Sequence, residues 1–175
     1  MKKKAVMLPF LLTIFFLLPS TASAQFTADH NYIGPSVGLS FLGSVPQFGL
    51  NYEYGMDLQN VGTVGIGGIF RYWGYSEDYW SYTNILIGAQ GNYHFKIPDS
   101  KLDPYIGLVL AYDIGSWSWK DQSISGLYNP SVGGFWAAIQ LGARYWISPT
   151  LALTGRLGFG SLSYGALEVG VDFKL

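Results

Sequence analysis

Hydrophobic and small or polar residues alternate without a break over the last ten positions, 166–175. Leu167, Val169 and Val171 share one side, while the residues between them are small, polar or charged. A period of two predicts a β-strand with one apolar and one polar face. Seven earlier segments follow the same rule and are separated by turn residues. The predicted strands span 32–42, 48–56, 63–73, 83–95, 105–114, 134–147, 151–159 and 166–175.

The two faces of these segments differ in a way that indicates where the protein resides. The apolar face holds the large side chains and carries no Asp, Glu, Lys or Arg, and only 12% of all residues are charged. A water-soluble barrel would instead need a polar exterior. Small residues on the second face suit the narrow interior of eight strands. The pattern therefore favours an all-β, eight-stranded antiparallel up-and-down transmembrane β-barrel, with both termini on one side.

The N-terminus has the pattern of an export signal. Three lysines at 2–4 precede an apolar stretch at 5–19, and Ala22-Ser23-Ala24 forms a small-residue cleavage site. The apolar stretch is shorter than the ~20 residues of a spanning helix. We expect a signal peptide over 1–24, export through the Sec pathway, cleavage after Ala24 and a barrel domain over 25–175. The chain has no cysteine, which excludes disulfides and a lipid-modified cysteine.

Three stretches resemble the small outer-membrane β-barrel proteins, the group with the OmpA membrane domain, OmpX and OmpW. They are Asp103-Pro104-Tyr105-Ile106-Gly107-Leu108, Arg144-Tyr145-Trp146-Ile147-Ser148-Pro149 and the C-terminal strand. The resemblance covers 25–175 and specifies an architecture, not an activity. It implies the outer membrane of a Gram-negative-type cell, a monomer, and contact with outer-membrane lipids and lipopolysaccharide. It also implies insertion by the barrel-assembly machinery through a C-terminal signal.

That signal corresponds here to Phe173 and Leu175. The family's last strand usually ends in Phe or Trp, so the final Leu175 is a departure.

Charged residues on the polar face are the first candidates for a site. If the last hairpin turns near Ser163, Arg156 lies opposite Gly170, and Arg144 pairs near Thr154. A gated narrow pore and a sealed interior both fit, and the sealed interior is favoured because eight strands leave little more than side-chain room. Buried charges then need partners, because unpaired ones are costly. The six candidates are Glu53, Arg71, Arg144, Arg156, Glu168 and Asp172.

Aromatic residues concentrate in the predicted outer loops, which span 43–47, 74–82, 115–133 and 161–165. The turns at 57–62, 96–104 and 148–150 would face the periplasm. The loop aromatics either form a ligand-binding surface or extend the interfacial girdle into lipopolysaccharide headgroups, and the second is favoured. They are Tyr75, Tyr79, Trp80, Tyr82, Trp117, Trp119 and Tyr128.

Other functions have little support in the sequence. The net charge is −1 and no basic run follows Lys4, so nucleic acid is not an expected partner. His30 and His94 are far apart and form no convincing metal site, and no cofactor is expected. Lipid A-modifying barrels use His with Ser and an acid, a set that cannot be assembled around His94.

We therefore predict a non-enzymatic barrel with a largely plugged polar interior and a structural or surface-interaction role. The alternative is a narrow channel for small or apolar solutes, as OmpW-like members imply. A lipid A-modifying enzyme is the least favoured.

Overall fold

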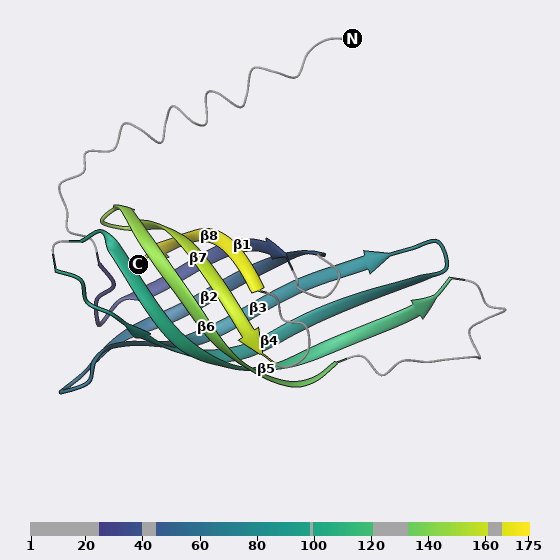
Figure 1. The fold of residues 1–175 in the computed structure, drawn as a ribbon, viewed down its shortest axis with the longest axis horizontal. Helices are drawn as coiled ribbons and strands as arrows, with labels where there is room; N and C mark the ends of the chain where they lie inside the picture. Colours follow the sequence, from purple (N-terminus) through teal and green to yellow (C-terminus); the bar gives the residue numbers. More distant parts are fainter. Residues whose placement is uncertain (1–24, 40–44, 99, 121–132, 161–165) are drawn as a thin grey trace, which may run out of the picture.

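The chain forms a closed antiparallel barrel of eight strands that pair in sequence order, with β1 joined to β8 (Figure 1). The computed structural model describes residues 25–39, 45–98, 100–120, 133–160 and 166–175. The strands are β1 (Asn31–Leu39), β2 (Pro46–Leu58), β3 (Gly62–Ser76), β4 (Trp80–His94), β5 (Leu102–Trp119), β6 (Gly133–Ser148), β7 (Leu151–Gly160) and β8 (Ala166–Lys174). The predicted fold class is confirmed. The predicted signal peptide and its cleavage site lie outside the described residues.

Closure of the barrel satisfies the backbone without water. Each strand pairs with a neighbour on both sides, so inter-strand hydrogen bonds occupy backbone groups that lipid cannot satisfy. β1 begins and β8 ends at the same end of the barrel, where the amide of Leu175 donates to the carbonyl of Asn31 at 2.8 Å. This end is called the terminal end below. No part of the described chain forms a helix long and apolar enough to cross a membrane.

The alternation of the sequence separates an exposed outer face from a buried interior. On β5, Leu108 is 63% exposed, whereas its neighbour Val109 is completely buried. On β6, Phe135 is 67% exposed and Trp136 is 1% exposed. The large apolar side chains therefore cover the outside of the barrel, as a lipid-facing surface requires.

Three strands extend beyond the barrel at the end opposite the termini (Figure 1). Pairing between β2 and β3 ends at Gln47↔Trp73, and pairing between β5 and β6 ends at Ile114↔Gly133. The pairing of β4 continues to Ser76↔Ser81 with β3 and to Trp80↔Trp119 with β5. We call this three-stranded extension, residues 74–84 and 115–119, the ribbon, and this end of the barrel the ribbon end.

The ribbon corrects the prediction that these residues form loops. Tyr75 lies on β3, Trp80 and Tyr82 on β4, and Trp117 and Trp119 on β5. Tyr79 alone among the described loop aromatics lies in the turn, and Tyr128 lies outside the described residues. The prediction was wrong because it required apolar residues on the outer face. In the ribbon the alternation continues with the polarity of its faces exchanged.

The exchange of faces is consistent along all three strands. Within the barrel, outward positions near this end hold Tyr72, Ile85 and Ile114. Further out, the same face carries only small or hydroxyl residues, and the opposite face carries the aromatic rings. The outward ribbon residues are Gly74, Ser76, Ser81, Thr83, Ser116 and Ser118. A face that meets water rather than hydrocarbon explains this change.

Candidate functional site

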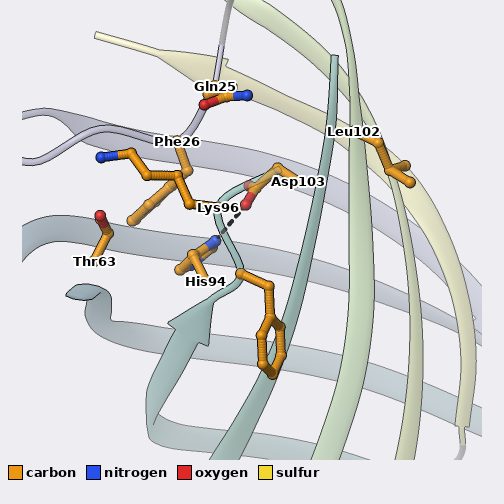
Figure 2. A pocket seen from close by; sticks show the side chains of 8 residues that line it. Gln25, Phe26, Thr63, His94, Lys96, Leu102 and Asp103 are labelled. Atoms are coloured by element: carbon orange, nitrogen blue, oxygen red, sulfur yellow. Dashed lines mark hydrogen bonds and ion pairs between the residues drawn. The ribbon is translucent and has the colours of Figure 1, made fainter. Parts of the chain in front are cut away.

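The interior is closely filled at the terminal end. A cavity of about 10 Å³, room for about one water molecule, is lined there by residues that include Phe26, Thr63, His94 and Asp103 (Figure 2). Phe26, Tyr32 and Trp146 form a small buried apolar cluster at this end together with Ala152. Ionisable side chains from five strands lie at this end: Glu53, His94, Asp103, Arg144 and Asp172.

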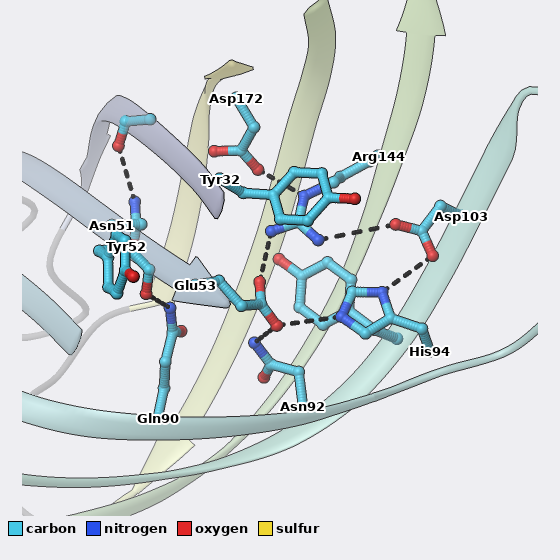
Figure 3. A network of polar contacts seen from close by, with 12 residues as sticks. Tyr32, Asn51, Tyr52, Glu53, Gln90, Asn92, His94, Asp103, Arg144 and Asp172 are labelled. Atoms are coloured by element: carbon cyan, nitrogen blue, oxygen red, sulfur yellow. Dashed lines mark hydrogen bonds and ion pairs between the residues drawn. The ribbon is translucent and has the colours of Figure 1, made fainter. Parts of the chain in front are cut away.

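Arg144 of β6 is the centre of the charged network (Figure 3). Its Nη2 donates to Oε2 of Glu53 at 2.5 Å, and its Nε donates to Oδ2 of Asp172 at 2.6 Å. Asp103 lies 3.6 Å from Nη1. One guanidinium thus compensates carboxylates from three other strands: β2, β5 and β8.

His94, the last residue of β4, lies between two of these carboxylates. Its Nδ1 is 2.9 Å from Oδ1 of Asp103, and its Nε2 is 3.0 Å from Oε1 of Glu53. A carboxylate oxygen accepts hydrogen bonds, so both contacts are satisfied only when both ring nitrogens carry a proton. Asn92 also donates to Oε1 of Glu53, at 2.8 Å. The arrangement therefore favours the imidazolium form of His94.

A second cluster surrounds Glu168, closer to the ribbon end on the β1–β8 side. Nε of Arg71 donates to Oε1 of Glu168, and Nη2 of Arg71 donates to Oε2 at 2.8 Å. Gln47 and Ser36 donate to the same carboxylate at 2.7 and 3.2 Å. This two-pronged pairing holds the planar guanidinium in one orientation.

Arg156 connects the two clusters. Its Nε donates to the hydroxyl of Tyr105 at 2.8 Å, and its terminal nitrogens lie 3.4 Å from Glu168 and 3.6 Å from Asp172. Arg156 pairs directly opposite Glu168, which corrects the predicted pairing with Gly170. A shift by two residues leaves every side chain on the same face, so alternation could not detect it. The expected pairing of Arg144 with Thr154 is observed.

The charges of the described network balance. Four carboxylates, Glu53, Asp103, Glu168 and Asp172, face three guanidiniums and the imidazole of His94. Inward glycines leave room for these groups: a Cβ on Gly65 would overlap the Glu53 carboxyl, and one on Gly142 would overlap the Tyr105 ring. The described interior charges thus lie next to partners of opposite charge.

All six predicted interior charges lie inside the barrel, each at most 4% exposed. Sequence reasoning left Asp103 out of this group because Asp-Pro suggests a turn, whereas Asp103 belongs to β5. It also placed His94 in the interior near the rim without a partner, and it did not include Gln47, Asn92 or Tyr105 among the site candidates. The inward position of each in the alternation was the signal that could have identified them.

The interior near the ribbon end is mainly apolar, apart from Asn84, which donates to Oδ2 of Asp113 at 2.7 Å. Its buried cluster includes two tryptophans and leads toward the ribbon, where Tyr82 packs against it. The members of the cluster are Val45, Ile69, Trp73, Leu86, Val109, Ala111, Trp136 and Ala138.

The aromatic face of the ribbon continues from this apolar cluster. Trp80 and Trp117 stack with ring centroids 4.5 Å apart and an interplanar angle of 8°. The Tyr82 ring is nearly parallel to both. Tyr75 lies 5.6 Å from Trp80 by ring centroids, and Trp119 meets Trp117 edge to face.

A cleft of about 370 Å³ lies beside β3, where it extends beyond β2. Pro46 and Phe48 line one part, Tyr75 and Tyr82 line another, and hydroxyls are contributed by Ser76, Ser81 and Thr83. No residue of this lining is a lysine, arginine or carboxylic acid.

The remaining candidates lie at the terminal end. Phe173 and Leu175 are exposed, at 42% and 70%. Nδ1 of His30 contacts the carbonyl of Ala28 at 2.8 Å and the hydroxyl of Thr27 at 3.2 Å. In the part of the chain that the structure describes, no cluster of three or more His, Cys, Asp or Glu residues could hold a metal ion.

Comparison with solved structures identifies the architecture as that of small outer-membrane barrels. The outer membrane protein OprG from Pseudomonas aeruginosa matches with a TM-score of 0.60 and 13% identity, over 87% of this chain and 91% of that one. The attachment invasion locus protein Ail of Yersinia pestis matches at 0.56 and 16%, over 83% and 97%. Neisserial surface protein A matches at 0.53 and 19%, over 83% and 95%. These likenesses establish the fold.

Comparison with family models and with curated proteins does not assign the chain to a family. No family model matches the chain, and no curated protein matches it. The structural neighbours are outer-membrane proteins and support an outer-membrane location for this barrel.

Proposed function

We propose that this protein is a non-enzymatic outer-membrane barrel with a closed interior, which acts at the cell surface through its ribbon. The terminal end then faces the periplasm, and the ribbon extends from the outer leaflet. The observation that carries this proposal is the exchange of polarity beyond Tyr72, Ile85 and Ile114. Hydroxyl residues on the outer face of the ribbon fit a layer of sugars better than hydrocarbon.

The contact that we assign to the ribbon is with the saccharide part of lipopolysaccharide, through the cleft beside β3. Aromatic rings and hydroxyls line this cleft, and charged side chains are absent from its lining. Aromatic faces pack against the apolar faces of sugar rings, whereas phosphate groups would require Lys or Arg. Related folds also meet saccharide-like ligands: Ail was crystallised with the heparin analogue sucrose octasulfate.

A stability measurement tests this contact. We expect lipopolysaccharide, added to the full barrel in phospholipid nanodiscs, to raise the unfolding midpoint. Tyr75→Ser, within the cleft lining, should lose at least half of that gain. Tyr79→Ser removes an exposed tyrosine from the nearby turn, outside the lining, and should keep it. The difference made by lipopolysaccharide is compared, so a change in basal stability cancels. Equal gains in both variants would refute the proposed contact.

A narrow channel is the second candidate, and the geometry of Arg156 is the observation in its favour. Its guanidinium lies within 3.6 Å of both Glu168 and Asp172, so it has two alternative carboxylate partners. A swing between them would change the width of the interior. Under this alternative, proteoliposomes swell in small solutes at a rate that Arg156→Ala changes. Absence of swelling in both proteins would exclude it.

Barrel insertion is a separate part of the proposal. Phe173 and Leu175 are the residues that we expect the barrel-assembly machinery to recognise. Leu175→Phe restores the usual family ending and should increase the assembled fraction in cells, whereas Phe173→Ala should reduce it. A monomer is expected and is tested by its mass in nanodiscs.

A further inference from the structure

The segment before β1, residues 25–30, folds back over the terminal end of the barrel interior. The Phe26 side chain is 4% exposed, although it precedes the first strand. Figure 2 shows its ring directed inward, next to His94 and Thr63. A residue so close to the end of the described chain is buried only if the barrel supplies a place for it.

That place is built around an aromatic ring. The Phe26 ring stacks on the His94 imidazole with centroids 3.6 Å apart and an interplanar angle of 6°. It also stacks on Tyr32 at 4.4 Å, and the Arg144 guanidinium carbon lies 5.1 Å from its centroid. Two flat partners and a cation favour an aromatic ring over an aliphatic side chain of similar size.

Polar contacts attach the rest of the segment to the rim. Nε2 of Gln25 donates to the carbonyls of Ile97 and Ser100 at 2.6 and 2.9 Å. The amide of Thr27 donates to the Tyr32 hydroxyl at 2.8 Å, and Nζ of Lys174 donates to Oγ1 of Thr27 at 2.8 Å. The amide of Asp29 donates to the carbonyl of Gly55 at 2.9 Å. The segment therefore contacts four separate parts of the rim.

We propose that the terminal end contains a binding site for an aromatic ring, formed by Tyr32, His94 and Arg144, and that Phe26 occupies it as a cork. The cork closes this mouth of the barrel and separates the charged network from water. The inference goes beyond the proposed surface role, because it concerns the opposite end of the molecule. The ligand that this site accepts is a planar aromatic group, which is here the ring of Phe26.

The absence of native cysteine permits a direct accessibility test. Thr63→Cys places a thiol in the small cavity beside Phe26, where Thr63 is 9% exposed. Thr150→Cys places one in the exposed turn between β6 and β7. A charged methanethiosulfonate is added to the full barrel in nanodiscs. We expect the thiol at 63 to react at least about tenfold more slowly than the thiol at 150, because it needs a local opening.

Removal of the ring should open the site. Phe26→Ala is expected to bring the two labelling rates to within about threefold, because the thiol at 63 then needs no opening. Phe70→Ala is the matched control, since it removes an identical side chain from the exposed outer face of β3, and Phe70 does not line this cavity. It should leave the thiol at 63 protected. Phe26→Leu fills most of the volume without a ring and should give partial protection; it also serves if Phe26→Ala fails to fold.

Rescue tests the chemistry of the site. Phenol added to Phe26→Ala should restore protection of the thiol at 63, whereas cyclohexanol should not. Fast labelling with Phe26 present, or equal opening by Phe70→Ala, overturns the cork. Failure of phenol, or equal protection by cyclohexanol, overturns the aromatic site. The proposed surface contact is untouched by any of these results, because it is measured through the ribbon.

Discussion

The two halves of the barrel interior are filled in opposite ways. From the terminal end to Glu168 on the β1–β8 side, four carboxylates, three guanidiniums and His94 form one paired network, called the charged half below. At the ribbon end, the interior is mainly an apolar cluster that includes Trp73, Leu86 and Trp136, with one Asn84–Asp113 hydrogen bond beside it; this is the apolar half. In the closed interior that we propose, the two halves exclude water by different physics. In the charged half each group depends on named partners, whereas in the apolar half stability follows the volume that is filled.

The charged half is expected to be the more sensitive to a single change. Arg144→Met removes the cation between Glu53 and Asp172 and leaves both carboxylates buried without it. We expect a loss of about 3–5 kcal/mol in the free energy of unfolding, as for other broken buried ion pairs. Urea unfolding in phospholipid vesicles, followed by tryptophan fluorescence, measures it. A loss of under about 1 kcal/mol would mean that water reaches and solvates these carboxylates.

An arginine placed on either side of the boundary between barrel and ribbon should give the next largest difference in the free energy of unfolding. Leu110→Arg places a charge on the outer face of β5 within the barrel and should cost about 2–4 kcal/mol if it lies near mid-membrane. Ser118→Arg makes a charged residue on the same face of the same strand within the ribbon. It should cost less than about 0.5 kcal/mol, as for an ordinary surface substitution. Equal costs in the same unfolding assay would contradict the assignment of the ribbon to the outside.

A buried hydroxyl in place of a methyl group of similar size should destabilise the apolar half. Val109 is fully buried in its cluster, and Val109→Thr replaces a methyl group by a hydroxyl. We expect a loss of about 1–3 kcal/mol in the free energy of unfolding, because the apolar side chains of the cluster offer the hydroxyl no hydrogen-bond partner. Temperature and urea unfolding of the two proteins provide the comparison. A neutral result would show that this half of the interior contains water.

The reverse exchange, in which a buried hydroxyl of the charged half is replaced by a methyl group, should have the smallest effect on stability. Thr154 is 5% exposed, and its Oγ1 makes no hydrogen bond within the described residues. Thr154→Val removes an unsatisfied polar atom at constant shape, so stability should stay the same or increase by about 1 kcal/mol. A clear loss would reveal an ordered water or a partner for this hydroxyl. Together, the changes in the free energy of unfolding caused by Val109→Thr and Thr154→Val measure how differently the two halves tolerate a buried hydroxyl.

The alternation of residues was sufficient to predict the barrel, because each face of a strand has a different solvent. It also predicted which side Glu53, Arg71 and Arg144 occupy, since side-chain direction depends only on parity. Alternation does not predict which residues of neighbouring strands lie opposite each other. The direct opposition of Arg156 and Glu168 depends on the last hairpin, and its loop residues give no clear turn signal.

Two further features could not be read from alternation alone. The ribbon reverses the expected polarity, so Trp80 and Trp117 were predicted in loops although their strands continue. The burial of Phe26 arises from tertiary contacts with Tyr32, His94 and Arg144, which come from three different strands. Local sequence does not encode such a contact, and only the closed barrel brings its members together.

We propose that paired charges and apolar packing together close the interior. Single-channel recording of the full barrel in planar lipid bilayers shows whether ions pass through it. We expect no unitary current steps from the wild-type protein. Stable unitary steps, abolished by Arg156→Ala or Glu168→Ala, would contradict this proposal and establish a conducting path through the charged network.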